Sequence, residues 1–412
     1  MGSQQKAGRL AAVRARFSSA SVSLAAMVVS LAHLIYVPAI PLVKDELGIS
    51  AASVAWTIAA FTLSQCLAQV LVGPMADRTN GTRLLRIGLV LFLVSNVLIL
   101  VLPTFEGLMA GRIITGFGAG MATGAGYALV AQGATAGKTR ERAMAAYQGI
   151  IAVGAVAGPS SGAAIIAFTG RWEHVFVVLL VASGFALLLS YLLPPPAVAF
   201  HAPTPREMWQ AARQRGVLVM ALVSGVVGVT IMTMHSSLSF VFGDGELPQQ
   251  WMEAVGFAMI PCGVLAGTML VRYLVQRFEG RSLLGVALVW LSGGIVCYGL
   301  VQEWTGGASL WLFPVLFASG IGLGAGMALT VGVATSLAAS TPGTVSAVVV
   351  VARNIGTTIA PFVVGFAYDG HHLWAAYLVS VVLVVVAGVV MALWARSSRR
   401  SRIAAVQADV VV

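Results

Sequence analysis

Twelve long apolar segments alternate along the chain with short polar connections. Each holds about 20 residues with almost no charge, the length a helix needs to cross a hydrocarbon layer of about 30 Å. Their length and lack of strict apolar–polar alternation favour helices over the strands of a barrel. The pattern predicts an all-α polytopic membrane protein with transmembrane helices at 20–43, 53–75, 83–102, 107–131, 142–168, 172–193, 217–242, 251–275, 282–301, 309–337, 345–366 and 373–394.

The connection between the sixth and seventh segments divides the chain. Three consecutive prolines at 194–196 end the sixth helix, and the basic stretch that follows is too polar to span a membrane. We therefore expect an N-terminal six-helix bundle over 1–193, a cytoplasmic linker over 194–216, and a C-terminal six-helix bundle with a basic cytoplasmic tail over 217–412.

A weak internal repeat predicts that the two bundles are pseudo-symmetric. Residues 78–85 resemble residues 277–284 at an offset of 199, and residues 118–122 repeat at 324–328 at an offset of 206. Transporters with such repeats place their substrate site near the bilayer midplane, between the halves.

The distribution of charge explains the formal net charge of +10. Every lysine and arginine belongs to the loops and termini of one side, except Lys44 and Arg171 on the other side and Arg112 and Arg353 inside apolar segments. The positive-inside rule then places both termini in the cytoplasm. We expect a multi-pass protein of the inner (cytoplasmic) membrane, whose basic tail meets the lipid bilayer rather than nucleic acid.

Chemistry that requires a metal or a cofactor has no support in the sequence. The three cysteines fall inside apolar segments, and their spacing matches no metal-ligand pattern. The chain has no nucleotide-binding loop and no convincing catalytic constellation. We expect no metal, no cofactor and no enzyme activity, which leaves a membrane enzyme or receptor as a remote alternative.

A carboxylate among basic residues marks the connection between the second and third segments. It reads Gly73-Pro-Met-Ala-Asp77-Arg78-Thr-Asn80-Gly81-Thr-Arg83. Asp77 can accept hydrogen bonds from the N–H groups of a neighbouring helix N-terminus, while Arg78 and Arg83 can meet carboxylates or lipid phosphates. The alternative is an ordinary basic loop on the cytoplasmic side.

Two further motifs lie inside apolar segments. Arg112 opens the sequence Arg112-Ile-Ile-Thr-Gly116-Phe-Gly118, where a cation needs a cavity, water or a partner unless it extends to the outer interface. The next segment reads Gly154-Ala-Val-Ala-Gly158-Pro159-Ser-Ser-Gly162, in which proline kinks the helix and glycines permit close packing.

These motifs resemble those of the major facilitator superfamily. The loop is similar to Gly-x-x-x-Asp-Arg-x-Gly-Arg-Lys/Arg, which in that family latches the cytoplasmic side closed. The Arg112 motif is similar to Arg-x-x-x-Gly-x-Gly of proton-coupled members, and Gly-x-x-x-Gly-Pro-x-x-Gly resembles the motif of drug:proton antiporters. The resemblance implies a twelve-helix drug:proton exporter that works by alternating access.

The loop departs from the family pattern at two points. Asn80 occupies the usual glycine position, which asparagine can fill because it tolerates a positive φ. Gly81 and Thr82 replace the usual basic pair, so we expect a weaker latch.

Histidine supplies the candidate proton carriers. His33 and His235 lie 202 residues apart at similar depths in the two halves, and histidine titrates near neutral pH. The pair could carry the coupling proton together with Arg112. The alternative is that each histidine is neutral and bonded to a neighbouring backbone or hydroxyl group.

The candidate substrate-binding residues are the same two histidines with further polar and aromatic side chains. Arg353, beside Asn354, lies about ten residues, or roughly 15 Å, inside its segment and could meet an anionic substrate or the backbone carbonyls of a neighbouring helix. Phe61, Gln65 and Gln69 recur every four residues on one helix face, and Tyr36 could add a stacking surface.

Together these features predict a secondary active transporter that exports amphipathic small molecules, neutral or anionic, in exchange for protons. We expect a monomer. The alternative within transport is an uptake symporter or a facilitator for an organic anion.

Overall fold

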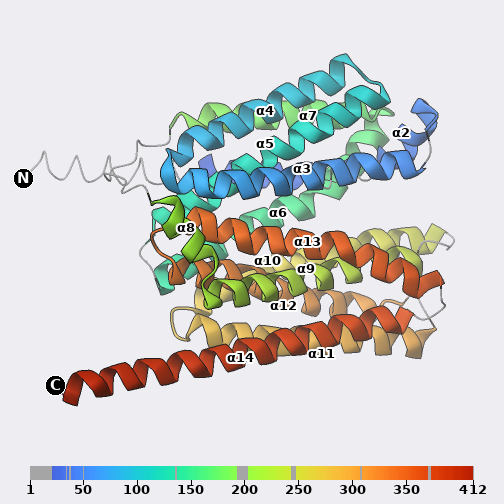
Figure 1. Cartoon of the computed structure of the whole chain (residues 1–412). Helices are drawn as coiled ribbons and strands as arrows, with labels where there is room; N and C mark the ends of the chain where they lie inside the picture. Colours follow the sequence, from blue (N-terminus) through green and yellow to red (C-terminus); the bar gives the residue numbers. More distant parts are fainter. Residues whose placement is uncertain are drawn as a thin grey trace, which may run out of the picture. The chain divides into compact units, whose positions relative to one another are not determined.

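The structure, a computed structural model, describes residues 21–33, 35–36, 39–49, 51–134, 137–192, 203–242, 247–306, 309–369 and 373–411. Every regular element of these residues is a helix (Figure 1). Nine helices of the described part are long and apolar enough to cross a membrane, and Ser21–His33 and Ala258–Leu274 are shorter apolar helices. Each of the twelve predicted segments contains a helix, which confirms the predicted all-α membrane fold.

In chain order, the helix at Ser21–His33 is followed by α2 (Ile40–Leu47), α3 (Ala51–Arg78), α4 (Gly81–Val101), α5 (Phe105–Gln132), α6 (Lys138–Thr169), α7 (Glu173–Ser190), α8 (Pro205–Ala212), α9 (Arg215–Phe242), α10 (Leu247–Leu274), α11 (Gly280–Thr305), α12 (Leu312–Leu337), α13 (Pro342–Asp369) and α14 (Leu373–Val411).

The first predicted segment, 20–43, is not one continuous helix. The helix at Ser21–His33 is followed by a turn at Ile35 and Tyr36, and α2 begins only at Ile40. The sequence accounts for the interruption, because the prolines at 38 and 41 have no N–H donor and restrict the residue before them. At the other end of the chain, α14 continues well past the predicted limit at 394.

Contacts between residues divide the chain into two compact units, which we describe separately. Unit 1 comprises Met1–Thr135, Gly149–Met208 and Ser340–Ala347, and unit 2 comprises Ala136–Gln148, Trp209–Ala339 and Val348–Val412. The first turns of α6 therefore belong to unit 2, and the first turns of α13 belong to unit 1.

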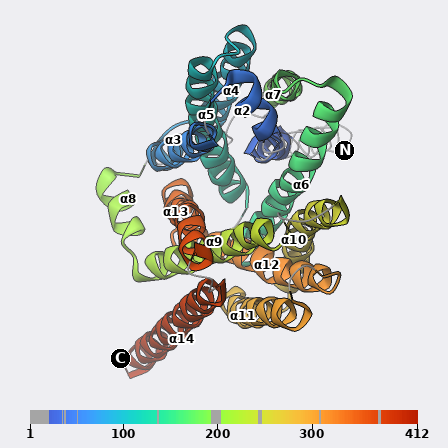
Figure 2. The same ribbon diagram turned by 90° about the vertical axis from the view of Figure 1, so that its right-hand side faces the viewer.

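In unit 1, α5 packs between α3 and α4, and α4 also contacts α7 (Figure 2). Glycine makes these approaches possible. A Cβ on Gly116 or Gly120 would collide with the backbone carbonyl oxygen of Phe61 or Gln65 on α3. A Cβ on Gly118 would collide with the carbonyl oxygen of Gly88 on α4. The absence of side chains lets the helix backbones touch, as in other membrane helix pairs.

In unit 2, α12 makes the corresponding contacts with α10 and α11, and α14 packs on α9 and α11. A Cβ on Gly320 or Gly324 would collide with the carbonyl oxygen of Ile260 or Val264 on α10. Gly320 and Gly324 are four residues apart, as Gly116 and Gly120 are in unit 1. The residues that supply the carbonyl oxygens, Ile260 and Val264, are also four residues apart, as Phe61 and Gln65 are.

The matching crossings show how the two halves correspond. Phe61 and Ile260 are 199 positions apart, the offset that the loop repeat gave, whereas Gly120 and Gly324 are 204 positions apart. The predicted offset of 206 for the glycine-rich repeat is therefore wrong by two residues. That alignment paired Gly118 with Gly324, because each opens an identical Gly-Ala-Gly-Met sequence. The backbone contacts instead pair Gly120 with Gly324.

We expect Gly120→Ala to destabilise the protein by about 1–3 kcal/mol, because the new methyl group must displace the backbone of α3. The melting temperature of the purified protein, followed by tryptophan fluorescence, measures this. Gly293→Ala is the matched control, since no atom of another described helix lies within 4 Å of a Cβ there. Equal melting temperatures for the two variants would contradict the close crossing.

Candidate functional site

Arg112 of α5 is buried in unit 1 and is only 1% exposed. Its Nε donates to the carbonyl oxygen of Thr57 at 3.4 Å and its Nη1 to that of Ala32 at 3.5 Å, while its Nη2 has no hydrogen-bond partner among the residues that the structure describes. These distances are long for hydrogen bonds. Arg112 is therefore enclosed by protein, and the described residues do not saturate its hydrogen-bonding capacity.

Aromatic rings enclose this guanidinium. Its central carbon lies 4.4 Å from the ring centroid of Phe61 and 5.1 Å from that of Tyr36, within the range of cation–π attraction. His33 meets the same Phe61 ring edge-on, with ring centroids 5.0 Å apart. The structure thus brings four of the predicted residues together, and we call His33, Tyr36, Phe61 and Arg112 the Arg112 cluster.

The polar face predicted on α3 continues from this cluster. Phe61, Gln65 and Gln69 are all buried. The Nε2 of Gln69 donates to the hydroxyl of Thr123 on α5 at 3.1 Å. Gln69 thus links α3 to α5, while Gln65 lies between it and the Arg112 cluster.

The remaining predicted substrate residues belong to unit 2. The Nδ1 of His235 lies 2.8 Å from the carbonyl oxygen of Ile231, which can only accept, so Nδ1 carries a proton. Arg353 of α13 is 8% exposed, and its backbone carbonyl lies against Gly228 of α9. The neighbouring Asn354 is half-buried. Because His33 belongs to unit 1 and His235 to unit 2, their pairing stays a prediction.

Asp77 is fully buried at the end of α3, where it caps the N-terminus of α13. Its Oδ1 accepts the N–H of Gly343 at 2.7 Å, and its Oδ2 accepts both the N–H and the hydroxyl of Thr344 at 2.6 Å. The N-terminus of a helix has unsatisfied N–H groups and a partial positive charge, so a carboxylate is favoured there. Gly73 permits the approach, because a Cβ there would collide with Ala347.

The rest of this loop differs from expectation at one residue. Asn80 has a φ of −70°, not the positive value for which asparagine is tolerated, and its side chain accepts the N–H of Thr82 at 2.9 Å. Asparagine is thus used as the N-cap of α4, for which it is among the best residues. Arg78 and Arg83 are exposed.

The motif on α6 packs against the helix at Ser21–His33. A Cβ on Gly154 or Gly162 would collide with the carbonyl oxygen of Met27 or Ile35, and the hydroxyl of Ser30 donates to the carbonyl of Ile151 at 2.7 Å. Gly158 is buried, and Pro159 is helical, although its side chain lies outside the described part. These glycines bring α6 close to the segment that carries His33 and Tyr36.

The first turn of α6 docks inside unit 2. Lys138 donates to the carbonyl of Gln276 at 3.0 Å, and Arg140 to that of Thr335 at 2.8 Å. The carboxylate of Glu141 is buried against Gly280 at the start of α11. Burial raises the pKa of the Glu141 carboxyl, and the nearby negative charge of another glutamate acts in the same direction.

Sequence reasoning missed a polar pair at the start of α7. Glu173 is 8% exposed, and its Oε1 accepts a hydrogen bond from Arg171 at 2.9 Å. Its Oε2 and the Nδ1 of His174 are buried, and no described residue forms a hydrogen bond with either atom. One turn along, the ring of Phe176 lies 5.8 Å from that of Tyr36. An acid in a first helical turn is common, so no sequence signal distinguished this one.

Within the described residues, no three His, Cys, Asp or Glu side chains lie close enough together to hold a metal ion. The three cysteines are free thiols; Cys66 and Cys262 are half-buried and Cys297 is exposed.

We expect Asp77→Asn to destabilise the protein by about 2–3 kcal/mol, because an amide nitrogen would face donors that now meet a carboxylate. Thermal unfolding of the purified protein measures the loss. Asp45→Asn removes a carboxylate whose side chain is 77% exposed and serves as the matched control. If both variants melt like the wild type, the carboxylate does not hold α13.

Comparison with known proteins adds to this geometry. The chain is 27% identical over 297 residues to the MFS-type transporter EfpA of Mycobacterium tuberculosis, covering 69% of this chain and 54% of EfpA, so it spans about half the length of that relative. It is 35% identical over 85 residues to the quinolone resistance protein NorA of Staphylococcus aureus, covering 21% of this chain and 22% of NorA.

Its fold is similar to that of the human organic anion transporter MFSD10 (TETRAN), with a TM-score of 0.69 and 17% identity over 91% of this chain and 99% of that one. A sequence profile of the Major Facilitator Superfamily matches residues 22–361. With twelve helical segments, two corresponding glycine crossings and this match over most of its length, the chain belongs to the Major Facilitator Superfamily.

Proposed function

We propose that this protein is a secondary active exporter of amphipathic small molecules that exchanges its cargo for protons. The observation that carries the proposal is the buried guanidinium of Arg112, whose Nη2 finds no hydrogen-bond partner in the described part of the chain and which shares the Phe61 ring with His33. A polar group of a substrate can meet that donor, and an amphipathic body can stack on Phe61 and Tyr36.

The chemistry of the Arg112 cluster supports proton coupling at His33. A proton on His33 places a second positive charge near Arg112, so the local environment is sensitive to anything else that binds there. A neutral cargo that occupies the cluster competes with this proton for space and hydrogen bonds. Reciprocal competition between cargo and proton is the thermodynamic basis of antiport.

Relatives point toward export. NorA carries the name of a quinolone resistance protein. The motif from Gly154 to Gly162 on α6 resembles that of drug:proton antiporters. Because the chain spans only part of EfpA and matches NorA over a short stretch, the cargo of this protein is inferred from its own residues.

An organic-anion symporter is the second candidate, and the same unsatisfied Nη2 favours it. An anion bound to Arg112 would stabilise a proton on His33, and two ligands that stabilise each other move together. The similarity in fold to a protein described as an organic anion transporter is compatible with this candidate. The charge of the cargo therefore decides the direction of coupling at this site.

The remaining expectations form part of the proposal. Transport proceeds by alternating access, in which the site opens to one side of the membrane at a time. The protein acts as a monomer in the inner membrane with both termini in the cytoplasm, as its charge asymmetry predicts.

Transport by the purified protein in liposomes with an imposed pH gradient tests the proposal. A pH-sensitive dye inside the liposomes reports proton movement as neutral, anionic and cationic amphipathic compounds are added. We expect neutral compounds to move protons in the opposite direction to the compound. Proton movement with an anion would establish the symporter, and flux without protons would establish a facilitator.

We expect Arg112→Gln to lower the transport rate by about 10- to 100-fold, which corresponds to the loss of a charge-assisted contact of about 1.5–3 kcal/mol. Arg206→Gln removes an exposed charge on α8, and this variant should transport normally.

His33→Gln should flatten the pH dependence of transport. If the pH profile of transport is unaltered in both His33→Gln and His235→Gln, histidine takes no part in the mechanism. If Arg353→Ala transports every compound as the wild type does, Arg353 does not belong to the substrate site.

A further inference from the structure

A groove runs between α9 and α14 in unit 2, at the end where α9 begins. On α9 its lining residues follow a spacing of three and four, and on α14 they do so over two turns, so each helix contributes one face. The lining residues are Arg215, Leu218 and Val219 of α9 and Val390, Leu393, Trp394 and Ser397 of α14.

The floor of this groove is apolar and open to the surroundings. Leu218 is 49% exposed and Leu393 is 59% exposed. In a membrane protein such a surface contacts lipid acyl chains, because apolar side chains are more stable in an apolar environment than in water. The stretch from Val390 to Ser397 spans roughly 10 Å along α14, at about 1.5 Å per residue, enough for part of an acyl chain.

Trp394 closes the polar end of the groove. Its ring packs on the first turn of α9, where a Cβ on Gly216 would lie only 2.6 Å from its Cζ2 atom. Tryptophan is enriched at the level of lipid headgroups, because its apolar ring can contact acyl chains while its N–H group is hydrated. The ring therefore marks where acyl chains end and headgroups begin.

Positive charge gathers at the same end. The guanidinium carbon of Arg281 lies 4.5 Å above the centroid of the Trp394 ring, and Arg215 is exposed at the start of α9. The N–H groups of the first turn of α9 add partial positive charge. Two carboxylates offset part of it: Glu279, whose Oε1 lies 4.0 Å from the Nε of Arg281, and the buried Glu141 beside Gly280.

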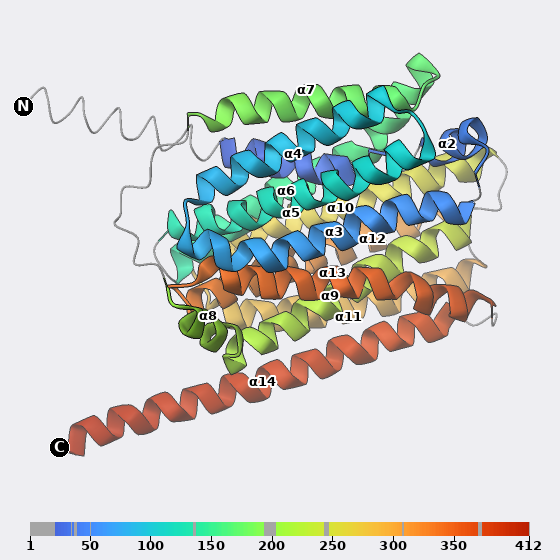
Figure 3. The ribbon, with the colours of Figure 1, turned by 45° about the horizontal axis from the view of Figure 1, so that its top comes forward.

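The helix that forms one wall continues beyond the groove. α14 is unbroken from Leu373 to Val411 and extends past the ends of α9 and α11 (Figure 3). Its sequence there adds Arg396, Arg399, Arg400 and Arg402. Clusters of arginine directly after a membrane span attract anionic lipids, with about 1 kcal/mol for each charge near the surface.

We propose that this groove binds an anionic phospholipid, with one acyl chain along Leu218, Val219, Val390 and Leu393 and the headgroup phosphate beside Arg215, Arg281 and Trp394. The lipid comes from the leaflet at the arginine-rich end, the cytoplasmic leaflet in the orientation that the charge asymmetry predicts. A phosphate ester without acyl chains would use the arginines but leave the apolar floor open.

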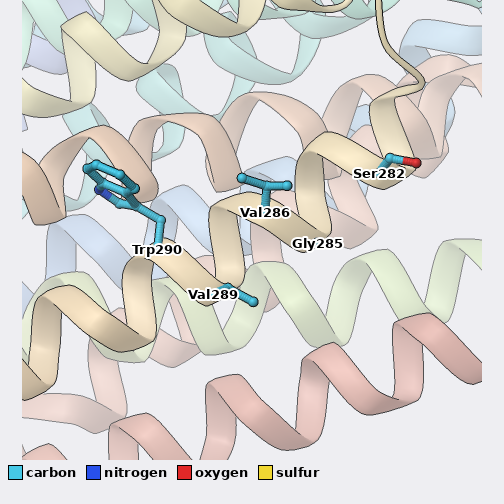
Figure 4. A pocket seen from close by; sticks show the side chains of 5 residues that line it. All are labelled: Ser282, Gly285, Val286, Val289 and Trp290. Atoms are coloured by element: carbon cyan, nitrogen blue, oxygen red, sulfur yellow. The ribbon is translucent and has the colours of Figure 1, made fainter.

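A second groove on α11 provides an internal contrast. It is lined by Ser282, Gly285, Val286, Val289 and Trp290 (Figure 4). Val286 and Val289 are 64% and 75% exposed, and no charged side chain lines this groove. It can accommodate an acyl chain but has nothing to select a headgroup, so lipid selectivity should belong to the groove beside Arg215.

Native mass spectrometry of the purified full-length protein tests the proposal, with phosphatidylglycerol and phosphatidylcholine of identical acyl chains as the probes. We expect the wild type to retain phosphatidylglycerol with the higher affinity. Arg215→Gln and Arg281→Gln should each weaken phosphatidylglycerol binding by about fivefold, the equivalent of about 1 kcal/mol, and leave phosphatidylcholine binding unchanged. Arg272→Gln removes an exposed charge outside the groove and should have no effect.

A steric pair tests the acyl chain. Val219→Trp fills the proposed groove with the arginines intact and should abolish the preference for phosphatidylglycerol, whereas Val286→Trp fills the groove on α11 and should preserve it. Equal affinities of the wild type for the two lipids, or full phosphatidylglycerol binding by Arg215→Gln/Arg281→Gln, would overturn the proposal. Displacement of the lipid by millimolar glycerophosphoglycerol, with no dependence on Val219→Trp, would show that the site binds a soluble phosphate ester instead.

Discussion

Contact between the backbones of α3 and α5 at Gly116 and Gly120 is the constraint on which unit 1 depends. Because neither glycine has a side chain, the carbonyls of Phe61 and Gln65 lie directly against α5. This approach brings Thr57 and Phe61 within reach of Arg112, one turn before Gly116. A wider separation would take the carbonyl of Thr57 and the ring of Phe61 away from the guanidinium and leave it only the carbonyl of Ala32 and the ring of Tyr36.

The same crossing recurs in unit 2 without this chemistry. At the offsets that the crossings define, Leu316 occupies the position of Arg112, Ile260 that of Phe61 and Val264 that of Gln65. Leu316 and Ile260 are fully buried. The backbone architecture is therefore shared between the halves, whereas the buried charge and the amide face belong to unit 1. In unit 2, the buried arginines are Arg353 of α13 and Arg140 of α6, which lie on other helices.

The helices were predictable because a long uncharged segment can adopt few backbone structures other than a helix in a membrane. The interruption of the first predicted segment follows from its prolines. The contact of Asp77 with a helix N-terminus follows from its chemical type, but which helix it caps depends on a residue pair 267 positions apart. The conformation of Asn80 was mispredicted because family resemblance suggested a glycine-like turn, while the chain uses the side chain as a cap. Burial of Glu173 could not be predicted, because acids at helix starts are usually exposed.

The central claim is that cargo and proton share the Arg112 cluster. Proton release on binding tests it most directly: the protein is placed in detergent with little buffer and a pH-sensitive dye, and a neutral compound that it transports is added. The account predicts release of a proton by the wild type and by His235→Gln, and none by His33→Gln. Undiminished release by His33→Gln would contradict it, because the proton would then come from a group outside the cluster.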